Sequence, residues 1–125
     1  MQIKRSLRQS LAGLKRAGVE IHARSVFLQG LLLMTPERLP ANLASARSQL
    51  EKFRAHADKM GLTPLQAALG FALGVPELDC VVVGVNSAAQ LAEILVAVPR
   101  SVDVQWLAQF ALGDPELLDP SRWPR

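Results

Sequence analysis

The sequence of 125 residues contains no tyrosine, only one cysteine and no long hydrophobic run. Its longest apolar clusters, around residues 30–34 and 80–85, are far shorter than the roughly 18 uninterrupted apolar residues that a membrane-spanning helix requires. We therefore expect no membrane segment.

The single cysteine, Cys80, falls in a short apolar run that is typical of a buried strand. No signal peptide is recognisable in the sequence. A lone cysteine fits a reducing compartment. We expect a cytoplasmic protein in which Cys80 acts as a small hydrophobic residue rather than as a nucleophile.

Acidic residues are missing from the start of the chain, where Glu20 is the first. Five basic residues precede it: Lys4, Arg5, Arg8, Lys15 and Arg16. This segment could be a solvated helix face, a nucleic-acid patch or an organelle-targeting helix. No aromatic residue is interleaved among the bases to stack on nucleic acid, and the helix runs through Gly18 directly into a strand. We favour the solvated face and expect no nucleic-acid partner.

The composition is that of a folded chain, because 50% of the residues are hydrophobic and 20% are charged. A chain of this length is one domain or a piece of one, with room for a modest core.

Apolar residues at helical spacing predict helices over residues 3–17, 41–60 and 64–73, from Ser87 to near Pro99, and again around Val104–Ala111. Capping boxes mark two helix starts, Thr63 with Gln66 and Ser87 with Gln90. Strict alternation over 19–24 and the apolar run 80–83 predict two strands. Residues 25–34 should form a loop or half-turn, and the proline-containing end of 99–125 a non-helical tail.

Two strands separated by helices predict a parallel sheet with right-handed crossovers. A two-stranded sheet is marginal on its own, and its exposed apolar edges invite pairing with another chain. The pattern therefore indicates part of a larger sheet.

The corner Gly84-Val85-Asn86 lies between the second strand and the helix after Ser87. A buried parallel strand that leads into a helix through glycine can present free backbone N–H groups to an anion. This corner is the strongest site candidate.

Two segments resemble a known family. His22-Ala-Arg-Ser-Val-Phe-Leu-Gln-Gly-Leu-Leu-Leu-Met34 is similar to the seventh strand and following loop of aldo/keto reductases. Val81-Val-Val-Gly-Val-Asn-Ser-Ala-Ala-Gln-Leu-Ala-Glu-Ile94 is similar to their eighth strand and eighth helix. With Gly61–Gly70 between them, the order fits the bacterial branch, and the resemblance covers about residues 7–98. It implies that residues 1–125 are the C-terminal portion of a (β/α)8 TIM barrel, an α/β fold with two parallel strands, surrounding helices and no complete barrel.

The family binds NADP(H), and the resemblance assigns binding residues in two groups. One group would wrap the cofactor pyrophosphate: Ser25, Phe27, Gln29 and Gly30. The other would line the adenosine 2′-phosphate and adenine regions: Gly84, Asn86, Ser87, Gln90 and Glu93.

The chain also departs from the family pattern. Arg24 stands where an aromatic residue often stacks on nicotinamide, and the family's lysine and arginine are missing at Gly84 and Gln90. The family's common asparagine is missing at Ile94. NADP is the expected cofactor, and NAD is possible.

The proposed binding residues also have structural interpretations that need no ligand. Gln90 would simply close the capping box with Ser87, Gly84 would permit a tight turn, and Ser25 would hydrogen-bond the neighbouring backbone.

Other polar residues fit structural roles better than chemical ones. His22 and His56 suit structural or solvated positions, and Asp79 and Asp114 suit turns or caps. His22 and Cys80 could approach only as an isolated pair, too few ligands for zinc. We expect no metal site.

The resemblance implies an oxidoreductase that transfers hydride between a nicotinamide and an aldehyde or ketone. In the family the catalytic aspartate, tyrosine, lysine and histidine lie in the first half of the barrel. Since this sequence has no tyrosine, catalysis by this chain alone in that manner is excluded. The leading hypothesis is a cofactor-binding portion that acts with the missing barrel half. The alternatives are a non-catalytic remnant that self-associates through open strand edges, and a basic accessory module that contacts an anionic partner.

Overall fold

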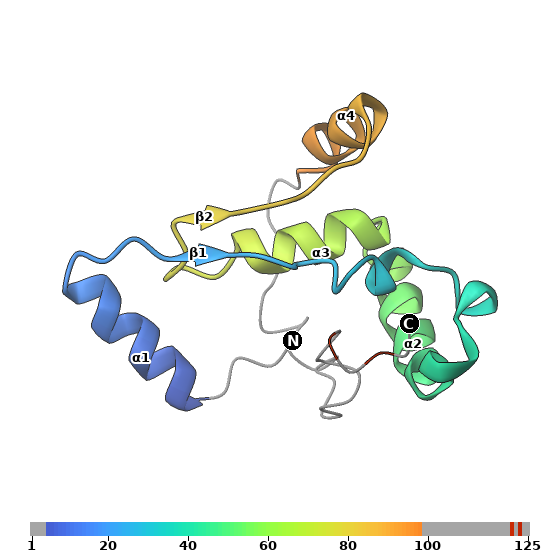
Figure 1. Ribbon diagram of the computed structural model, residues 1–125, viewed down its shortest axis with the longest axis horizontal. Coiled ribbons are helices and arrows are strands. Elements are labelled where there is room, and N and C mark those ends of the chain that lie inside the picture. Colours follow the sequence, from blue (N-terminus) through green and yellow to red (C-terminus); the bar gives the residue numbers. More distant parts are fainter. Residues whose placement is uncertain (1–4, 99–120, 122, 124–125) are drawn as a thin grey trace.

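The computed structural model describes residues 5–98, 121 and 123 as an α/β arrangement of helices and a small parallel sheet (Figure 1). The order of elements is α1 (Arg5–Arg16), β1 (His22–Ala23), η1 (Leu31–Leu33), η2 (Pro36–Arg38), η3 (Ala41–Ala46), α2 (Arg47–Lys59), α3 (Pro64–Leu73), β2 (Cys80–Val81) and α4 (Ala88–Ala97). The α/β class predicted from the sequence is confirmed. The predicted helix around Val104–Ala111, and Asp114, lie outside the described residues.

The sheet consists of β1 and β2, which pair in parallel with His22 opposite Cys80 and Ala23 opposite Val81. Three further backbone bonds join the two segments. Asp79 N–H and Cys80 N–H donate to Ile21 O at 2.8 and 3.3 Å, and Val82 N–H donates to Ala23 O at 2.8 Å. Both strands are shorter than the predicted 19–24 and 80–83. Among the described residues, each strand is paired along one edge only. Regular pairing ends where the two extended segments separate.

The core lies where α3 packs against α2, to the right of the two short strands in Figure 1. Helix α3 is almost wholly buried because it is built from alanine and leucine; Ala67, Ala68 and Ala72 are each at most 5% exposed. Its predicted capping box is present. Gln66 N–H donates to Thr63 Oγ1, and Thr63 N–H donates to Gln66 Oε1. The small side chains of α3 let Leu50, Phe53 and Ala57 of α2 approach closely.

The helix predicted over 41–60 is correct only in its second part. It begins as the 3-10 helix η3 and becomes α-helical at Arg47. Pro40 precedes η3, and no side chain caps its N-terminus. Without such a cap the first amide groups favour the tighter hydrogen-bonding pattern common at helix ends. Gly61, with a φ of 67°, ends the helical segment as expected.

The prediction that the second strand is buried on both faces is wrong. Cys80 is exposed, and Val82 is 49% exposed. Ile21 is buried, whereas His22 and Cys80 are opposite each other in the sheet and both exposed. The apolar residues correctly predicted a strand, but a strand is buried only where other elements pack on both of its faces.

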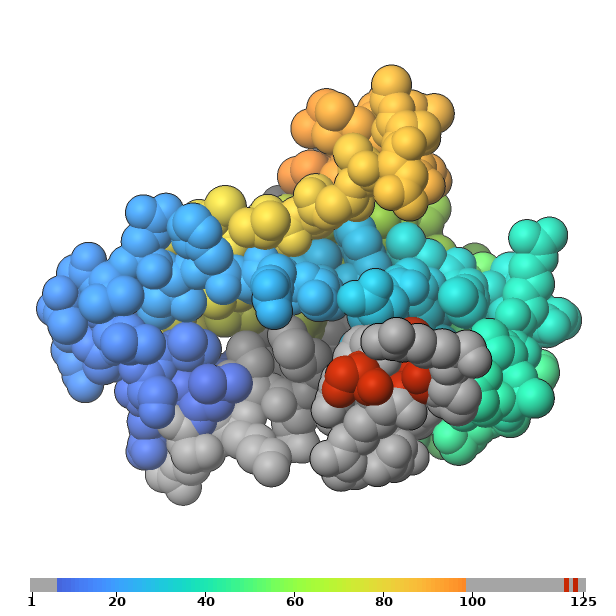
Figure 2. Space-filling model, in the orientation of Figure 1, coloured from blue at the N-terminus to red at the C-terminus, as the bar shows by residue number. Residues whose placement is uncertain are grey.

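The outer helices are poorly covered as well. Figure 2 shows α4, in orange, projecting from the rest of the described chain. Its residues Leu95 and Val96 are 66% and 84% exposed. The apolar stripe predicted on α1 is also only partly covered, because Leu7 and Leu14 remain nearly half exposed.

The basic side chains described on α1, Arg8, Lys15 and Arg16, are exposed, as the solvated-face reading predicts. Trp123 packs against a separate small cluster formed by Leu31, Leu43 and Ala46. None of the described helices has the length and apolar character needed to cross a membrane.

Candidate functional site

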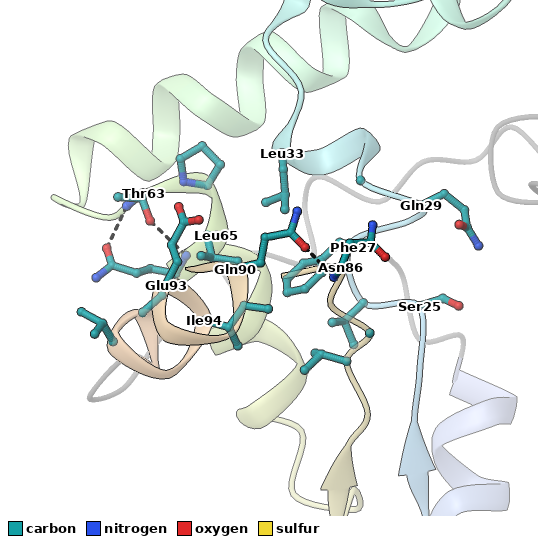
Figure 3. A pocket seen from close by; sticks show the side chains of 18 of the residues that line it. Ser25, Phe27, Gln29, Leu33, Thr63, Leu65, Asn86, Gln90, Glu93 and Ile94 are labelled. Carbon is teal, nitrogen blue, oxygen red and sulfur yellow. Dashed lines mark hydrogen bonds between the residues drawn. The ribbon is translucent and has the colours of Figure 1, made fainter. Parts of the chain in front are cut away.

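A broad, open pocket of about 1110 Å³ lies where the chain leaves the carboxyl ends of β1 and β2 (Figure 3). The turn after β1, the N-terminus of α3, the corner after β2 and one side of α4 form its walls. All the candidate residues except Ser87 line it: Ser25, Phe27, Gln29, Gly30, Gly84, Asn86, Gln90 and Glu93. Two segments that are far apart in the sequence therefore meet in one pocket.

The turn after β1 has an unusual backbone. Ser25, Leu28 and Gln29 have φ values of 59°, 48° and 54°, and Gly30 follows at 85°. Such left-handed conformations are costly for residues other than glycine and persist only where surrounding bonds hold them. Leu28 N–H donates to Ser25 O at 2.9 Å, and Gly30 N–H donates to Phe27 O at 3.0 Å. The sequence predicted an irregular turn here, but only Gly30 signalled its handedness.

Phe27 fixes this turn to the body of the protein. Its ring packs against both the α2–α3 core and the cluster formed by Leu65, Leu69 and Ala97. Phe27 thus reaches the elements on both sides of the pocket. Its neighbours Ser25 and Gln29 are more exposed and carry the polar groups of the turn (Figure 3).

The corner after β2 is held by hydrogen bonds from α4. Ser87 caps the helix, since its Oγ accepts from Gln90 N–H at 3.1 Å. The Gln90 side chain does not return to Ser87 as a full capping box requires. Its Oε1 accepts from Asn86 N–H at 2.8 Å (Figure 3). Gln90 thus stabilises the corner through its carbonyl oxygen and lines the pocket as well, so its structural and binding roles are compatible.

Arg24 and Arg54 also line the pocket. Neither was predicted from the sequence to be a site residue. Arg24 entered only as a departure from the family pattern. Arg54 did leave a signal in the sequence, because it lies four residues after Leu50 and three before Ala57, both buried on α2. A charged residue on an otherwise apolar helix stripe indicates a polar partner or a pocket.

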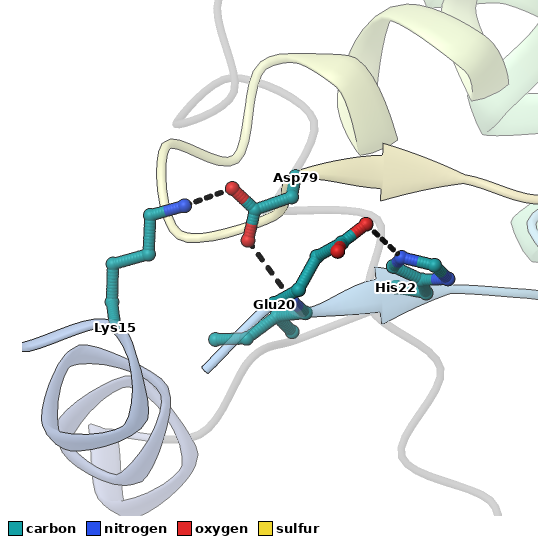
Figure 4. Close-up of polar contacts among 5 residues, drawn as sticks. Lys15, Glu20, His22 and Asp79 are labelled. Atoms are coloured by element: carbon teal, nitrogen blue, oxygen red, sulfur yellow. Dashed lines mark hydrogen bonds and ion pairs between the residues drawn. The ribbon is translucent and has the colours of Figure 1, made fainter. Parts of the chain in front are cut away.

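A second polar cluster lies at the opposite ends of the strands (Figure 4). Asp79 accepts a hydrogen bond from Lys15 Nζ of α1 and another from Ile21 N–H at 2.9 Å. The bond from Lys15, and then that from Ile21, hold the pKa of the Asp79 carboxyl below its usual value of 3.8. Asp79 was predicted to be a turn or cap residue; it also connects α1, β1 and β2.

Each histidine contacts a residue close to it in the sequence. His22 Nε2 is 2.6 Å from Glu20 Oε1 (Figure 4), and His56 Nδ1 is 3.1 Å from the carbonyl oxygen of Lys52. Within residues 5–98, 121 and 123, no group of three or more His, Cys, Asp or Glu side chains is arranged to hold a metal ion.

Comparison of the chain with protein-family models, with curated proteins and with solved structures found no match.

Proposed function

We propose that this chain is the cofactor-binding, C-terminal portion of an aldo/keto reductase-like oxidoreductase. It would bind NADP, or NAD, and take part in carbonyl reduction once the rest of a (β/α)8 barrel is supplied. One observation carries the proposal. The two segments that resemble the family line one pocket at the carboxyl ends of two adjacent parallel strands. In such barrels the loops after the last two strands often bind phosphate groups.

The partly covered surfaces support the barrel portion of the proposal. Cys80 and Val82 on the sheet face, Leu95 and Val96 on α4, and Leu7 and Leu14 on α1 are all exposed. Neighbouring strands with their own helices would cover these surfaces together. A partner that supplies the missing barrel half accounts for them with a single arrangement.

The residues of the pocket suit a nicotinamide dinucleotide. The Ser25 hydroxyl and the Gln29 amide can donate hydrogen bonds to pyrophosphate oxygens. Gly84, where an added Cβ would meet nothing within 4 Å, and Asn86 would line the adenosine 2′-phosphate region. The Glu93 carboxylate can accept from the adenine amino group. Bound cofactor would supply the hydride. This chain would hold and orient it, while the proton donor must come from the missing half because the chain has no tyrosine.

Titration of the full chain with NADPH, followed by cofactor fluorescence, tests the proposal. We expect saturable binding that Ser25→Ala weakens by about two- to tenfold, the effect of one lost hydrogen bond. Gln90→Ala should weaken it at least as much, since it also releases Asn86 N–H. Ser48→Ala and Gln49→Ala, on α2 and outside the pocket, are the matched controls. Absence of binding at millimolar cofactor, or equal binding by all variants, would contradict the site.

A second candidate is a non-catalytic chain that self-associates through its open strand edges. The exposure of Val82 beside β2 and of Leu95 on α4 favours it. Unpaired edges next to apolar side chains readily pair with another chain. NADPH titration combined with size-exclusion chromatography and light scattering separates the two candidates. Binding of NADPH supports the first whether or not the isolated chain associates, and a discrete oligomer that binds none supports the second.

A further inference from the structure

The charged residues of the pocket are unevenly distributed. Among the described residues that line it, two are cationic, Arg24 directly after β1 and Arg54 on α2, and one is acidic, Glu93 on α4. Neither arginine forms an ion pair with Glu93 or with any other described residue. The side of the pocket next to the turn at residues 25–34 is therefore positively charged.

Arg54 is held at this wall by the backbone. Its Nη1 donates to the carbonyl oxygen of Met34 at 3.1 Å, and Met34 N–H in turn donates to Gly30 O at 3.2 Å. The side chain thereby braces the end of the turn. A guanidinium group has five N–H donors, and Arg54 makes no other hydrogen bond with the part of the chain that the structure describes. Its remaining donors are available to a ligand.

Arg24 lies at the start of the same turn. It is exposed and makes no hydrogen bond or ion pair with the described residues. Two like charges on one concave surface, neither paired with a described acidic residue, raise the local positive potential. An anion in the pocket would be attracted by both, most strongly where Arg54 is partly shielded from water.

We propose that Arg24 and Arg54 bind the pyrophosphate of the dinucleotide. This inference rests on the proposed function. Phosphate oxygens match the forked donors of arginine, and the two arginines line the same pocket as Ser25 and Gln29, the polar residues of the turn. No cation lines the pocket from Gly84 to Gln90, so the arginines supply charge at the turn rather than at the corner. Because pyrophosphate is common to both cofactors, they should not favour NADP over NAD.

The test is to titrate NADH and NADPH into the full-length chain and into Arg24→Gln, Arg54→Gln and Arg54→Lys. Each glutamine variant should raise Kd about tenfold or more, the usual size of a lost charged hydrogen bond, and equally for the two cofactors. Arg54→Lys should retain part of the affinity because it keeps the charge. Inorganic pyrophosphate should displace NADH from the unmodified chain and much less from Arg24→Gln. Arg38→Gln and Arg47→Gln, exposed and outside the pocket, should bind normally.

The possible outcomes separate the two proposals. If the unmodified chain binds and the glutamine variants bind equally well, the arginine assignment is overturned while the proposed function stands. If the variants lose affinity for NADPH alone, the arginines bind the 2′-phosphate and the pyrophosphate assignment is wrong. If the unmodified chain binds neither cofactor, the proposed function fails and the arginine site with it. Circular dichroism of Arg24→Gln and Arg54→Gln checks that loss of binding is not loss of folding.

Discussion

At the scale of single residues, Asp79 shows how one exposed carboxylate can connect three elements. It accepts hydrogen bonds from Lys15 on α1 and from Ile21 beside β1, and it immediately precedes β2. Helix α1 packs only lightly against the sheet, since Leu7 and Leu14 remain nearly half exposed. The contact through Asp79 should therefore contribute much of what fixes the position of α1.

We predict that Asp79→Asn lowers the free energy of unfolding near neutral pH and loosens α1. A depressed carboxyl pKa means that the folded state favours the ionised form. The stabilisation is complete above the unfolded pKa, near 3.8, and is lost as pH falls through the lower folded pKa. Urea denaturation followed by circular dichroism should show a difference between Asp79→Asn and the unmodified chain at pH 7 that shrinks below pH 3.8.

Asp58→Asn is the matched control, because Asp58 is exposed and its carboxylate makes no bond with the described residues. It should lack this pattern. A difference between Asp79→Asn and the unmodified chain that stays constant down to low pH would show that the carboxylate charge is not responsible.

At the scale of elements, α3 and α4 begin alike but are packed differently. A side-chain hydroxyl caps each, Thr63 for α3 and Ser87 for α4. Helix α3 is buried on most sides, while α4 exposes Leu95 and Val96. The same local signal therefore opens one helix of the core and one helix at the margin.

We predict that Thr63→Ala lowers the global free energy of unfolding by about 1 kcal/mol. Ser87→Ala removes the equivalent bond, but its effect should remain local to α4, which can open without unfolding the core. Hydrogen exchange should show slow amides in α3 for the unmodified chain and faster ones in α4. Ser87→Ala should accelerate only α4. Equal acceleration of both helices by Ser87→Ala would contradict this difference.

The starts of α3 and α4 were well predicted from the sequence because a helix cap is a local signal. The start of α2, which has no side-chain cap, was not. The strand lengths and the burial of Cys80 were not, since both depend on neighbours that the pattern cannot supply. The left-handed conformations of Leu28 and Gln29 gave no sequence signal, because neither residue favours positive φ. Arg54 was missed at the site for a related reason. A helix stripe shows that a charge faces inward, but not which pocket it reaches.

At the scale of the whole molecule, large apolar side chains remain exposed on α1, next to β2 and on α4. Large exposed apolar residues of this kind mark interaction surfaces. The account predicts that the isolated chain self-associates at high concentration, because no described element covers these residues.

Replacing Leu95 and Val96 together with lysine should shift the chain toward monomer without lowering its stability, since both side chains are already mostly exposed. Light scattering over a concentration series and thermal denaturation measure the two effects. Leu50→Lys, which alters a buried residue of α2, should instead unfold the chain. Unchanged association of the double variant would remove α4 from the interface.

The central claim is that the turn at residues 25–30 and the corner at residues 84–93 act as one clamp for a nicotinamide dinucleotide. Titration of the isotope-labelled chain with NADPH, followed residue by residue through amide chemical shifts in NMR, tests it most directly. The account predicts that amides of both segments shift together along one binding curve, while amides of η3 remain unchanged. Shifts confined to one segment, or spread evenly over the chain, would contradict it.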